Sequence, residues 1–290
     1  DITISAGSTT GTASFTPTDD SIYDATSNET ATVSIDSVSG GDALENGTQS
    51  VTITITDNES APTVTLSRSA AAIDENSSST VTITATLSNA TYQDVTVSIG
   101  ASGGTEGTDY ATISDITISA GSTTGTASLD PTDDSVYEDD ETVTVTIDGV
   151  SGGGASESGT QAVTITITDN ENAPTVTLAT SATSIAENAG SSLTLTATLS
   201  NVADEDVTVA LSTSGAATEG TDYTDGSGAI DDIVISAGST TGTVSFTPSD
   251  DSIYEDDEAA VIAVSGVSGA DATESGTQSV TITITENESA

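Results

Sequence analysis

The chain has 290 residues, with one Lys or Arg, 46 Asp and Glu and no His, so its formal net charge is −45. Neutralising nucleic-acid phosphates or anionic membrane surfaces requires Lys and Arg, so both classes of partner are excluded. The absence of Cys and His removes thiol and imidazole catalysts, zinc and haem ligands and disulfides. No stretch reaches the roughly 18 consecutive apolar residues of a membrane span, so no direct membrane insertion is expected.

Internal repeats define the organisation. The segment 2–24 returns with few changes at 116–138 and 233–255, and VTITITDNE at 51–59 returns at 163–171 and, as VTITITENE, at 280–288. A period of roughly 115 residues is typical of one small domain per repeat. We therefore expect the second half of a repeat at 1–59 and complete repeats at 60–171 and 172–290, joined by short Ala-Pro-Thr junctions.

Each complete repeat has the sequence pattern of an all-β domain. Apolar residues alternate with Thr and Ser, as at Val81, Ile83, Ala85 and Leu87, which is typical of half-buried antiparallel strands. About seven strands with Gly, Ser, Asn and Asp between them predict tandem immunoglobulin-like antiparallel β-sandwiches. In the repeat 60–171 we expect strands near 63–67, 79–88, 94–99, 112–118, 125–130, 142–148 and 162–168.

Residues 1–59 contain only the later strands of such a sandwich. They would leave an open sheet edge and a half-covered apolar face. The two following repeats are complete in themselves and have no spare strands to donate. We therefore expect this chain to be part of a longer array, with the missing strands located before Asp1 or in a neighbouring chain.

Carboxylates concentrate at the strand ends and turns. In the repeat 60–171 they lie in the segments IDENSSS, TEGTDY, DDSVYEDDE and DNE. Alternate loops of a sandwich converge on one end, so these groups are expected to meet in space. Eight converging carboxylates with one basic residue in the whole chain need a cation, and ligands restricted to oxygen select Ca²⁺. Such a set could hold about two to four ions.

These motifs resemble the Calx-beta domain, a family found in sodium-calcium exchangers, in integrin β4 and in bacterial surface proteins of the adhesin type. The resemblance rests on Glu75 and Glu187 in the first strand, on the G-T-D-Y turns at 107–110 and 220–223, on the D-D-x-x-Y-E-x-x-E run and on the terminal acidic triplet. It implies a seven-strand sandwich with Ca²⁺ bound at one end.

The resemblance also implies a ligand set for each repeat. In the repeat 60–171 the ligands would be Glu75, Asp109, Asp133, Asp134, Glu138, Glu141, Asp169 and Glu171. In the repeat 172–290 they would be Glu187, Asp222, Asp250, Asp251, Glu255, Glu258, Glu286 and Glu288. The half repeat offers Asp19, Asp20, Asp24, Glu29, Asp57 and Glu59. The triplets hold Asn170 and Asn287 where calcium-binding members often have Asp, so the number of ions per repeat stays open.

Two other interpretations of the acidic residues remain. An acidic surface also serves solubility or adaptation to high salt, but it would distribute the acids evenly. A glycosidase needs only two carboxylates, but its cleft usually carries aromatic platforms, and the chain has no Trp and two Phe. We therefore expect no enzymatic activity. Tyr110, Tyr137, Tyr223 and Tyr254 lie beside acidic motifs and are expected to pack as a lid or corner.

The favoured function is a calcium-stiffened structural module in an extracellular or cell-surface adhesin stalk, matrix protein or filament. The near-identity of the repeats favours this function, because a stalk needs copies of one spacer. The alternative is a calcium-sensing or ligand-binding module attached to another domain. The expected partners are neighbouring repeats of the same protein, or identical chains in a filament. Ions beside the short junctions are expected to limit bending between repeats.

Overall fold

The computed structural model describes residues 1–26 and 28–289. The chain divides into two compact units. Unit 1 comprises residues 1–71, 79–130 and 142–165, and unit 2 comprises residues 72–78, 131–141 and 166 onwards. Unit 2 therefore contains three of the four acidic segments of the repeat 60–171, all but TEGTDY, together with the repeat that follows. Within the described residues, no helix is long and apolar enough to cross a membrane.

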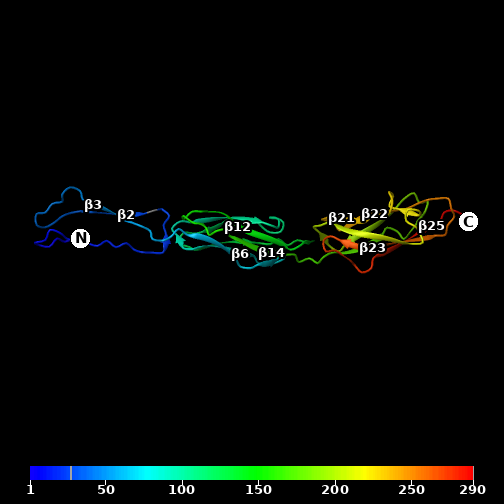
Figure 1. Cartoon of the computed structure of the whole chain (residues 1–290), viewed down its shortest axis with the longest axis horizontal. Helices are drawn as coiled ribbons and strands as arrows, with labels where there is room; N and C mark the ends of the chain where they lie inside the picture. The colour runs from blue at the N-terminus through cyan, green and yellow to red at the C-terminus, as the bar shows by residue number, and fades with distance from the viewer. Residues whose placement is uncertain (27, 290) are drawn as a thin grey trace. The chain divides into compact units, whose positions relative to one another are not determined.

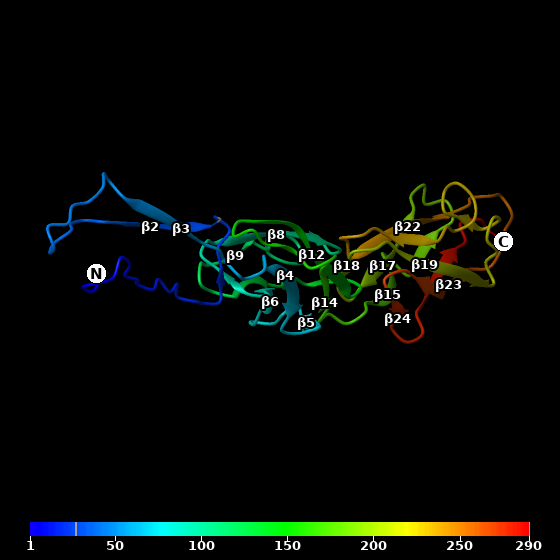
Figure 2. The ribbon, with the colours of Figure 1, turned by 60° about the vertical axis from the view of Figure 1, so that its left-hand side comes forward.

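Unit 1 contains most of one β-sandwich (Figures 1 and 2). One sheet has the order β10-β6-β4-β13, and in the other β14, β12, β8 and β9 are consecutive. The bounds are β4 Thr63–Arg68, β6 Val81–Leu87, β8 Val95–Ser102, β9 Ile116–Ile118, β10 Thr124–Leu129, β12 Glu141–Ser151, β13 Ser156–Glu157 and β14 Ala162–Thr168. These eight strands include all seven that the sequence pattern predicts.

The alternation of apolar and polar residues builds the core of this sandwich. In β6, Val81, Ile83, Ala85 and Leu87 are buried while the Thr residues between them are half-buried. Complete burial of a side chain such as Ile83 contributes roughly 1.5–3 kcal/mol. In β12 the register with β8 shifts between Ile147 and Gly149, which is a β-bulge. The fold class is therefore the all-β sandwich that the sequence predicts.

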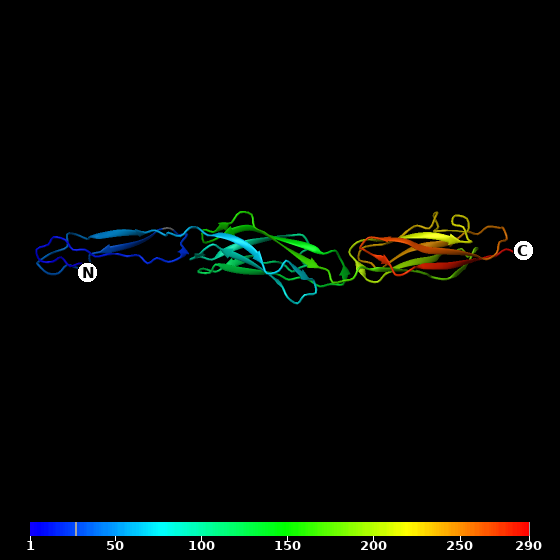
Figure 3. The same ribbon diagram turned by 60° about the horizontal axis from the view of Figure 1, so that its bottom comes forward.

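Unit 2 contains a second sandwich, whose layers can be followed in Figure 3. Its sheets have the orders β20-β22-β17-β15-β24 and β16-β25-β23-β19-β21. The bounds are β15 Thr175–Thr180, β16 Ser184–Ala186, β17 Leu193–Leu199, β19 Val207–Gly215, β20 Tyr223–Thr224, β21 Ile233–Ile235, β22 Thr241–Pro248, β23 Glu258–Ser268, β24 Thr273–Glu274 and β25 Ser279–Thr285. Phe246 and Ile262 are among its fully buried side chains.

The edges of both sandwiches depart from the expected antiparallel pairing. The first strand of the later repeat is split into β15 and β16, which belong to different sheets, and β16 pairs with β25 in parallel. In the earlier repeat the same split gives β5 (Ala72–Asp74), which pairs in parallel with the last residues of β14. A strand that crosses from one sheet to the other must pair with a different neighbour in each sheet. In the second sheet that neighbour, β14 or β25, runs parallel to it.

Residues 1–59 form no closed sandwich within the described residues. Their regular structure is the hairpin of β2 (Glu29–Ser34) and β3 (Ser50–Ile55) and the short strand β1 (Ile22–Tyr23). Ile2, Ile4, Phe15 and Val51 are each at least 45% exposed. Apolar side chains of residues 1–59 are therefore partly exposed in this structure.

Short parallel strands join successive repeats within each unit. In unit 1, β1 pairs with β7 (Ala90–Thr91), so Tyr23 lies beside Thr91. In unit 2, β11 (Val136–Tyr137) pairs in the same way with β18 (Val202–Ala203). Tyr137 packs against the core of the following sandwich. The acidic D-D-x-x-Y-E run of one repeat is therefore also the segment that contacts the next repeat.

Candidate metal centres

Two chain segments bring three carboxylates together in unit 2. Glu75 follows β5, and Asp169 and Glu171 follow β14. One carboxylate oxygen of each lies within 4.8 Å of the others. The Glu75 side chain is 5% exposed, and its backbone N–H donates to the carbonyl of Thr168 at 3.0 Å. The parallel pairing of β5 with β14 therefore positions this group, which we call the Glu75 cluster.

The side-chain amide of Asn170 lies among these carboxylates. Its Nδ2 is 2.9 Å from Glu75 Oε1, 3.2 Å from Asp133 Oδ1 and 3.2 Å from Glu171 Oε2. Asn76 Nδ2 donates to Asn170 Oδ1 at 2.8 Å and so holds the amide in this orientation. An amide nitrogen has two hydrogens, so it cannot satisfy three carboxylates at once. The residue that departs from the family pattern is thus part of the cluster.

The environment of the Glu75 cluster disfavours ionisation of Glu75 and Glu171. Burial raises the pKa of Glu75. Burial, a hydrogen bond with Asp169 and the nearby negative charges raise the pKa of Glu171 to about 7. A bound cation would oppose both effects, because it stabilises the charged form of each carboxyl.

Hydrogen bonds connect this cluster to the D-D-x-x-Y-E-x-x-E run. The backbone N–H of Glu138 donates to Asp169 Oδ2 at 3.2 Å, and the backbone N–H of Asp169 donates to Asp140 Oδ1 at 3.2 Å. Asp134 Oδ1 accepts the backbone N–H of Val136 at 2.7 Å. Sequence reasoning missed Asp140. The signal was available, since Asp140 belongs to the same acidic run.

The remaining predicted residues of this repeat lie outside the group of three. Asp133 contacts Asn170, as described above. Glu141 is the half-buried first residue of β12. Asp109 belongs to unit 1, where its carboxylate accepts the backbone N–H of Thr105 within the segment TEGTDY at 105–110.

The later repeat holds two further groups of three carboxylates, and in each group one oxygen of every carboxylate lies within 4.8 Å of the others. The Glu187 cluster comprises Glu187, Asp250 and Glu288, and the Asp222 cluster comprises Asp222, Glu255 and Glu258. Among the described residues, Glu288 Oε2 is the one buried side-chain polar atom without a hydrogen-bond partner. A buried oxygen left without a donor is costly unless a cation or water satisfies it.

One pocket joins these clusters. Its lining includes Glu187 and Asp222, and the other predicted residues along it are Asp251, Glu255, Glu258 and Glu286. It also includes Asp256, which sequence reasoning missed. The predicted residues of this repeat therefore gather at one end of the sandwich, from the loops after β16, β22 and β25 and the turn before β20.

Burial and mutual repulsion act on the carboxyl groups of this pocket. Burial raises the pKa of Glu187, and burial together with Asp222 raises that of Glu258. Glu286 shows the opposite shift: hydrogen bonds from the backbone N–H and side chain of Glu288 lower its pKa to about 2. The pocket therefore combines one strongly acidic carboxyl, Glu286, with Glu187 and Glu258, which resist ionisation.

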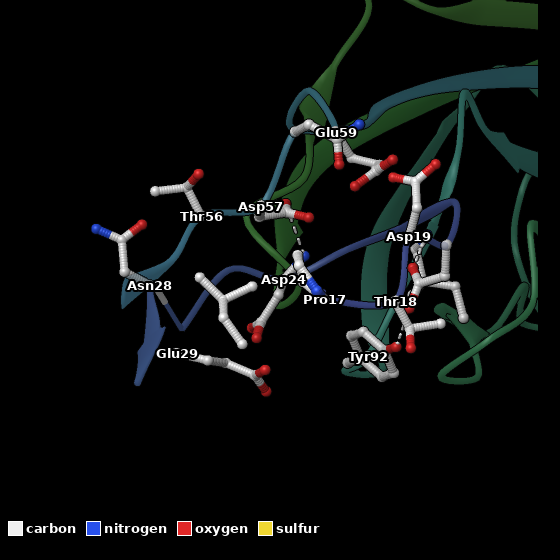
Figure 4. Close-up of a pocket in the computed structure, with 14 residues that line it drawn as sticks. Pro17, Thr18, Asp19, Asp24, Asn28, Glu29, Thr56, Asp57, Glu59 and Tyr92 are labelled. Atoms are coloured by element: carbon white, nitrogen blue, oxygen red, sulfur yellow. Dashed lines mark hydrogen bonds between the residues drawn. The ribbon is translucent and has the colours of Figure 1, made fainter. Parts of the chain in front are cut away.

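The half repeat places its predicted residues around a more open pocket (Figure 4). The backbone N–H of Asp24 donates to Asp57 Oδ2 at 3.1 Å, as Glu138 does to Asp169. The Tyr92 hydroxyl donates to Asp20 Oδ2 at 2.6 Å and lowers the pKa of that carboxyl. The other predicted residues that line this pocket are Asp19, Glu29 and Glu59. Within the described residues, the groups of three carboxylates whose oxygens lie within 4.8 Å of one another all belong to the two complete repeats.

The tyrosines beside the acidic motifs have different environments. Tyr110 is 2% exposed, and Tyr223 is fully buried and stacks on Phe246 with a centroid distance of 4.6 Å. Tyr137 contacts the next repeat and donates from its hydroxyl to Asp271 Oδ2 at 3.1 Å. Tyr254 is 49% exposed. The expectation of a packed lid or corner therefore holds for Tyr110 and Tyr223 and is wrong for Tyr254.

The residues present suit a hard cation. Each candidate cluster consists only of carboxylate groups, without nitrogen or sulfur ligands. The chain has one Lys or Arg to balance 46 acidic residues. Glu288 Oε2 is buried and unpaired. This chemistry matches Ca²⁺, which takes six to eight oxygens with flexible geometry.

The family comparisons divide the chain into two matched segments. Residues 60–170 match the model of the LapA domain. Residues 169–288 match the model of the Calx-beta domain. Residues 169–288 are therefore similar to the Calx-beta domain. The resemblance inferred from the acidic motifs is thereby confirmed for this segment, whereas the preceding repeat matches a different family model. A comparison with curated protein sequences gives no match.

Solved structures show weak similarity. The CBD12 structure from CALX1.2 has 16% identity and a TM-score of 0.33, over 76% of this chain and 99% of that one. The calcium binding domain CBD12 of CALX1.1 has 17% identity and a TM-score of 0.31, over 66% and 76%. The Yersinia pseudotuberculosis adhesin InvE has 15% identity and a TM-score of 0.36, over 76% and 58%.

Proposed function

We propose that this chain is a calcium-stabilised structural segment of an extracellular adhesin-type or matrix protein. In this proposal residues 1–59, 60–171 and 172–290 are successive repeats, and calcium binds at the acidic end of each complete repeat. The match to the Calx-beta family and the three carboxylate clusters support calcium as the ligand. The proposed partners are neighbouring repeats of the same protein.

Asp169 connects the proposed ion site to the contact between repeats. Asp169 belongs to the Glu75 cluster and also accepts the backbone N–H of Glu138. Glu138 directly follows Tyr137, which contacts the next repeat. An ion on Asp169 would therefore hold the residue that adjoins the inter-repeat contact.

The proposed ligands use oxygen only. Glu75, Asp169 and Glu171 would hold one ion, Glu187, Asp250 and Glu288 a second, and Asp222, Glu255 and Glu258 a third. Each ion would supply positive charge where the carboxylates now repel one another, and backbone carbonyls and water would complete its coordination. The half repeat, whose carboxylates are more open, would bind calcium more weakly.

Calorimetric titration of the whole chain with calcium chloride tests this proposal. We expect saturable binding at a constant ionic strength and weaker binding of magnesium, which requires tighter octahedral geometry. Absence of saturable calcium binding, or equal stabilisation by sodium chloride, would favour an acidic surface adapted to salt instead. The alternative of a calcium sensor predicts the same binding, but also requires a regulated neighbouring domain.

A further inference from the structure

The same five-residue segment occurs three times in the chain, and we call it the docking segment. Its copies are residues 20–24, 134–138 and 251–255. In each copy the first Asp accepts a backbone N–H two residues later: Asp20 from Ile22 at 2.8 Å, Asp134 from Val136 at 2.7 Å and Asp251 from Ile253 at 2.6 Å. The segment therefore has the same local turn whether or not another repeat covers it.

The end of each docking segment is also held in the same way. The backbone N–H of its last residue donates to the first acid of the terminal triplet, from Asp24 to Asp57, from Glu138 to Asp169 and from Glu255 to Glu286, at distances of 2.5–3.2 Å. The apolar residue and the tyrosine between these two attachments are thus presented from a fixed backbone. This geometry is complete in the last repeat as well.

A receiving surface covers the first two docking segments. The backbone N–H of Tyr92 donates to the carbonyl of Tyr23 at 3.4 Å, and that of Asp204 donates to the carbonyl of Tyr137 at 3.2 Å. A glycine-rich or left-handed loop completes each receiver. A Cβ added at Gly154 would lie 2.8 Å from Tyr23, and Asp271, with a φ of 48°, accepts the Tyr137 hydroxyl.

The third docking segment presents the same side chains to solvent. Ile253 is 63% exposed and Tyr254 is 49% exposed, whereas Ile22, Tyr23, Val136 and Tyr137 are all half-buried. An isoleucine and a tyrosine exposed side by side on an ordered turn form a small apolar surface. The equivalent segments at 20–24 and 134–138 show that such a surface contacts a short strand of the following repeat.

We propose that Ile253 and Tyr254 are the docking site for a further repeat of this type. The occupant is a repeat with its own receiving surface, namely a short strand equivalent to Val202–Ala203 and a loop equivalent to residues 269–272. In a second copy of this chain, the receivers at 90–91 and 202–203 already hold Tyr23 and Tyr137. This favours a following repeat over a second copy. The proposal rests on the proposed structural role but not on calcium binding.

The test uses the whole chain extended after Ala290 by a copy of residues 174–288. Amide hydrogen exchange of residues 252–255 is measured by mass spectrometry in the original and extended chains, with residues 135–138 as the internal reference. We expect the extension to slow exchange at 252–255 by about tenfold or more, towards the rate of the reference. Each comparison is made with and without calcium, so that failure of calcium binding does not obscure the result.

A matched pair of substitutions makes the test specific. In the extended chain, Tyr254→Ser should restore fast exchange at 252–255, whereas Tyr92→Ser, at a different junction, should not. Unchanged exchange on extension would overturn the proposal, as would slowing that survives Tyr254→Ser. Slowing in the original chain as its concentration rises would identify a second copy as the occupant and would also overturn it.

Discussion

The backbone N–H of Glu138 lies 3.2 Å from Asp169 Oδ2, and this hydrogen bond joins the acidic cluster of one repeat to the segment that contacts the next. Asp169 is shared between the two roles, because its carboxylate also lies within 4.8 Å of Glu75 and Glu171. A change in the charge on Asp169 should therefore affect both the cluster and the junction.

Calcium should raise the melting temperature of the whole chain. Bound ions relieve repulsion among the clustered carboxylates, and binding stabilises the folded state by about 2.7 kcal/mol per independent site when free calcium is 100 times its dissociation constant. Differential scanning calorimetry at a constant ionic strength measures this shift. Magnesium should give a smaller shift, and sodium chloride at equal ionic strength should not reproduce it.

Asp169→Asn should remove most of the calcium stabilisation associated with the Glu75 cluster. The substitution keeps an oxygen near the Glu138 N–H but removes one charged ligand from the group of three. Calcium affinity and the calcium-dependent shift in melting temperature are the measurements. Asp36→Asn is the matched control, because Asp36 lies at an exposed position outside the acidic clusters. Equal losses in the two variants would contradict the assignment.

The metal-free chain should lose stability as the pH rises from about 4.5 to 7. The pKa of Glu171 is raised from 4.5 to about 7 on folding, so in this interval the folded state binds more protons than the unfolded state. Stability therefore decreases with increasing pH through this window. Urea unfolding at several pH values checks the trend. Glu171→Gln should flatten it, and an unchanged slope in that variant would assign the effect to other groups.

Tyr137→Phe should weaken the junction by about 1 kcal/mol, the usual net contribution of one hydrogen bond. It removes the hydroxyl that donates to Asp271 Oδ2 at 3.1 Å and keeps the ring against the following core. Tyr137→Ala should cost more, because it also removes the buried part of the ring. The free energy of urea unfolding measures both. Tyr254→Phe, at the exposed equivalent position, should have little effect.

Sequence reasoning predicted the sandwiches because long alternating strands such as Val81–Leu87 have a strong period of two. It missed the short strands Ala72–Asp74 and Val136–Tyr137, since two or three residues carry no detectable period. The parallel pairing of these strands depends on how the chain crosses between sheets, which composition does not encode.

The acidic clusters were predictable in kind, because carboxylates concentrate at strand ends. Which of these carboxylates come together in space was harder to predict. Glu75, Asp169 and Glu171 meet because β5 runs parallel to β14. The part played by Asp140 depends on the direction of one backbone N–H. The acidic run makes Asp140 a candidate, but the direction of that N–H cannot be inferred from local sequence.

Amide hydrogen exchange at Glu138 and Asp204, compared with and without calcium at equal ionic strength, tests most directly whether ion binding stabilises the junction. The Glu138 amide donates to the proposed ligand Asp169, and the Asp204 amide donates across the repeat junction to the Tyr137 carbonyl. We predict that calcium slows exchange at both amides and that Asp169→Asn abolishes this slowing at both. Saturable calcium binding that leaves the exchange of both amides unchanged would contradict the account.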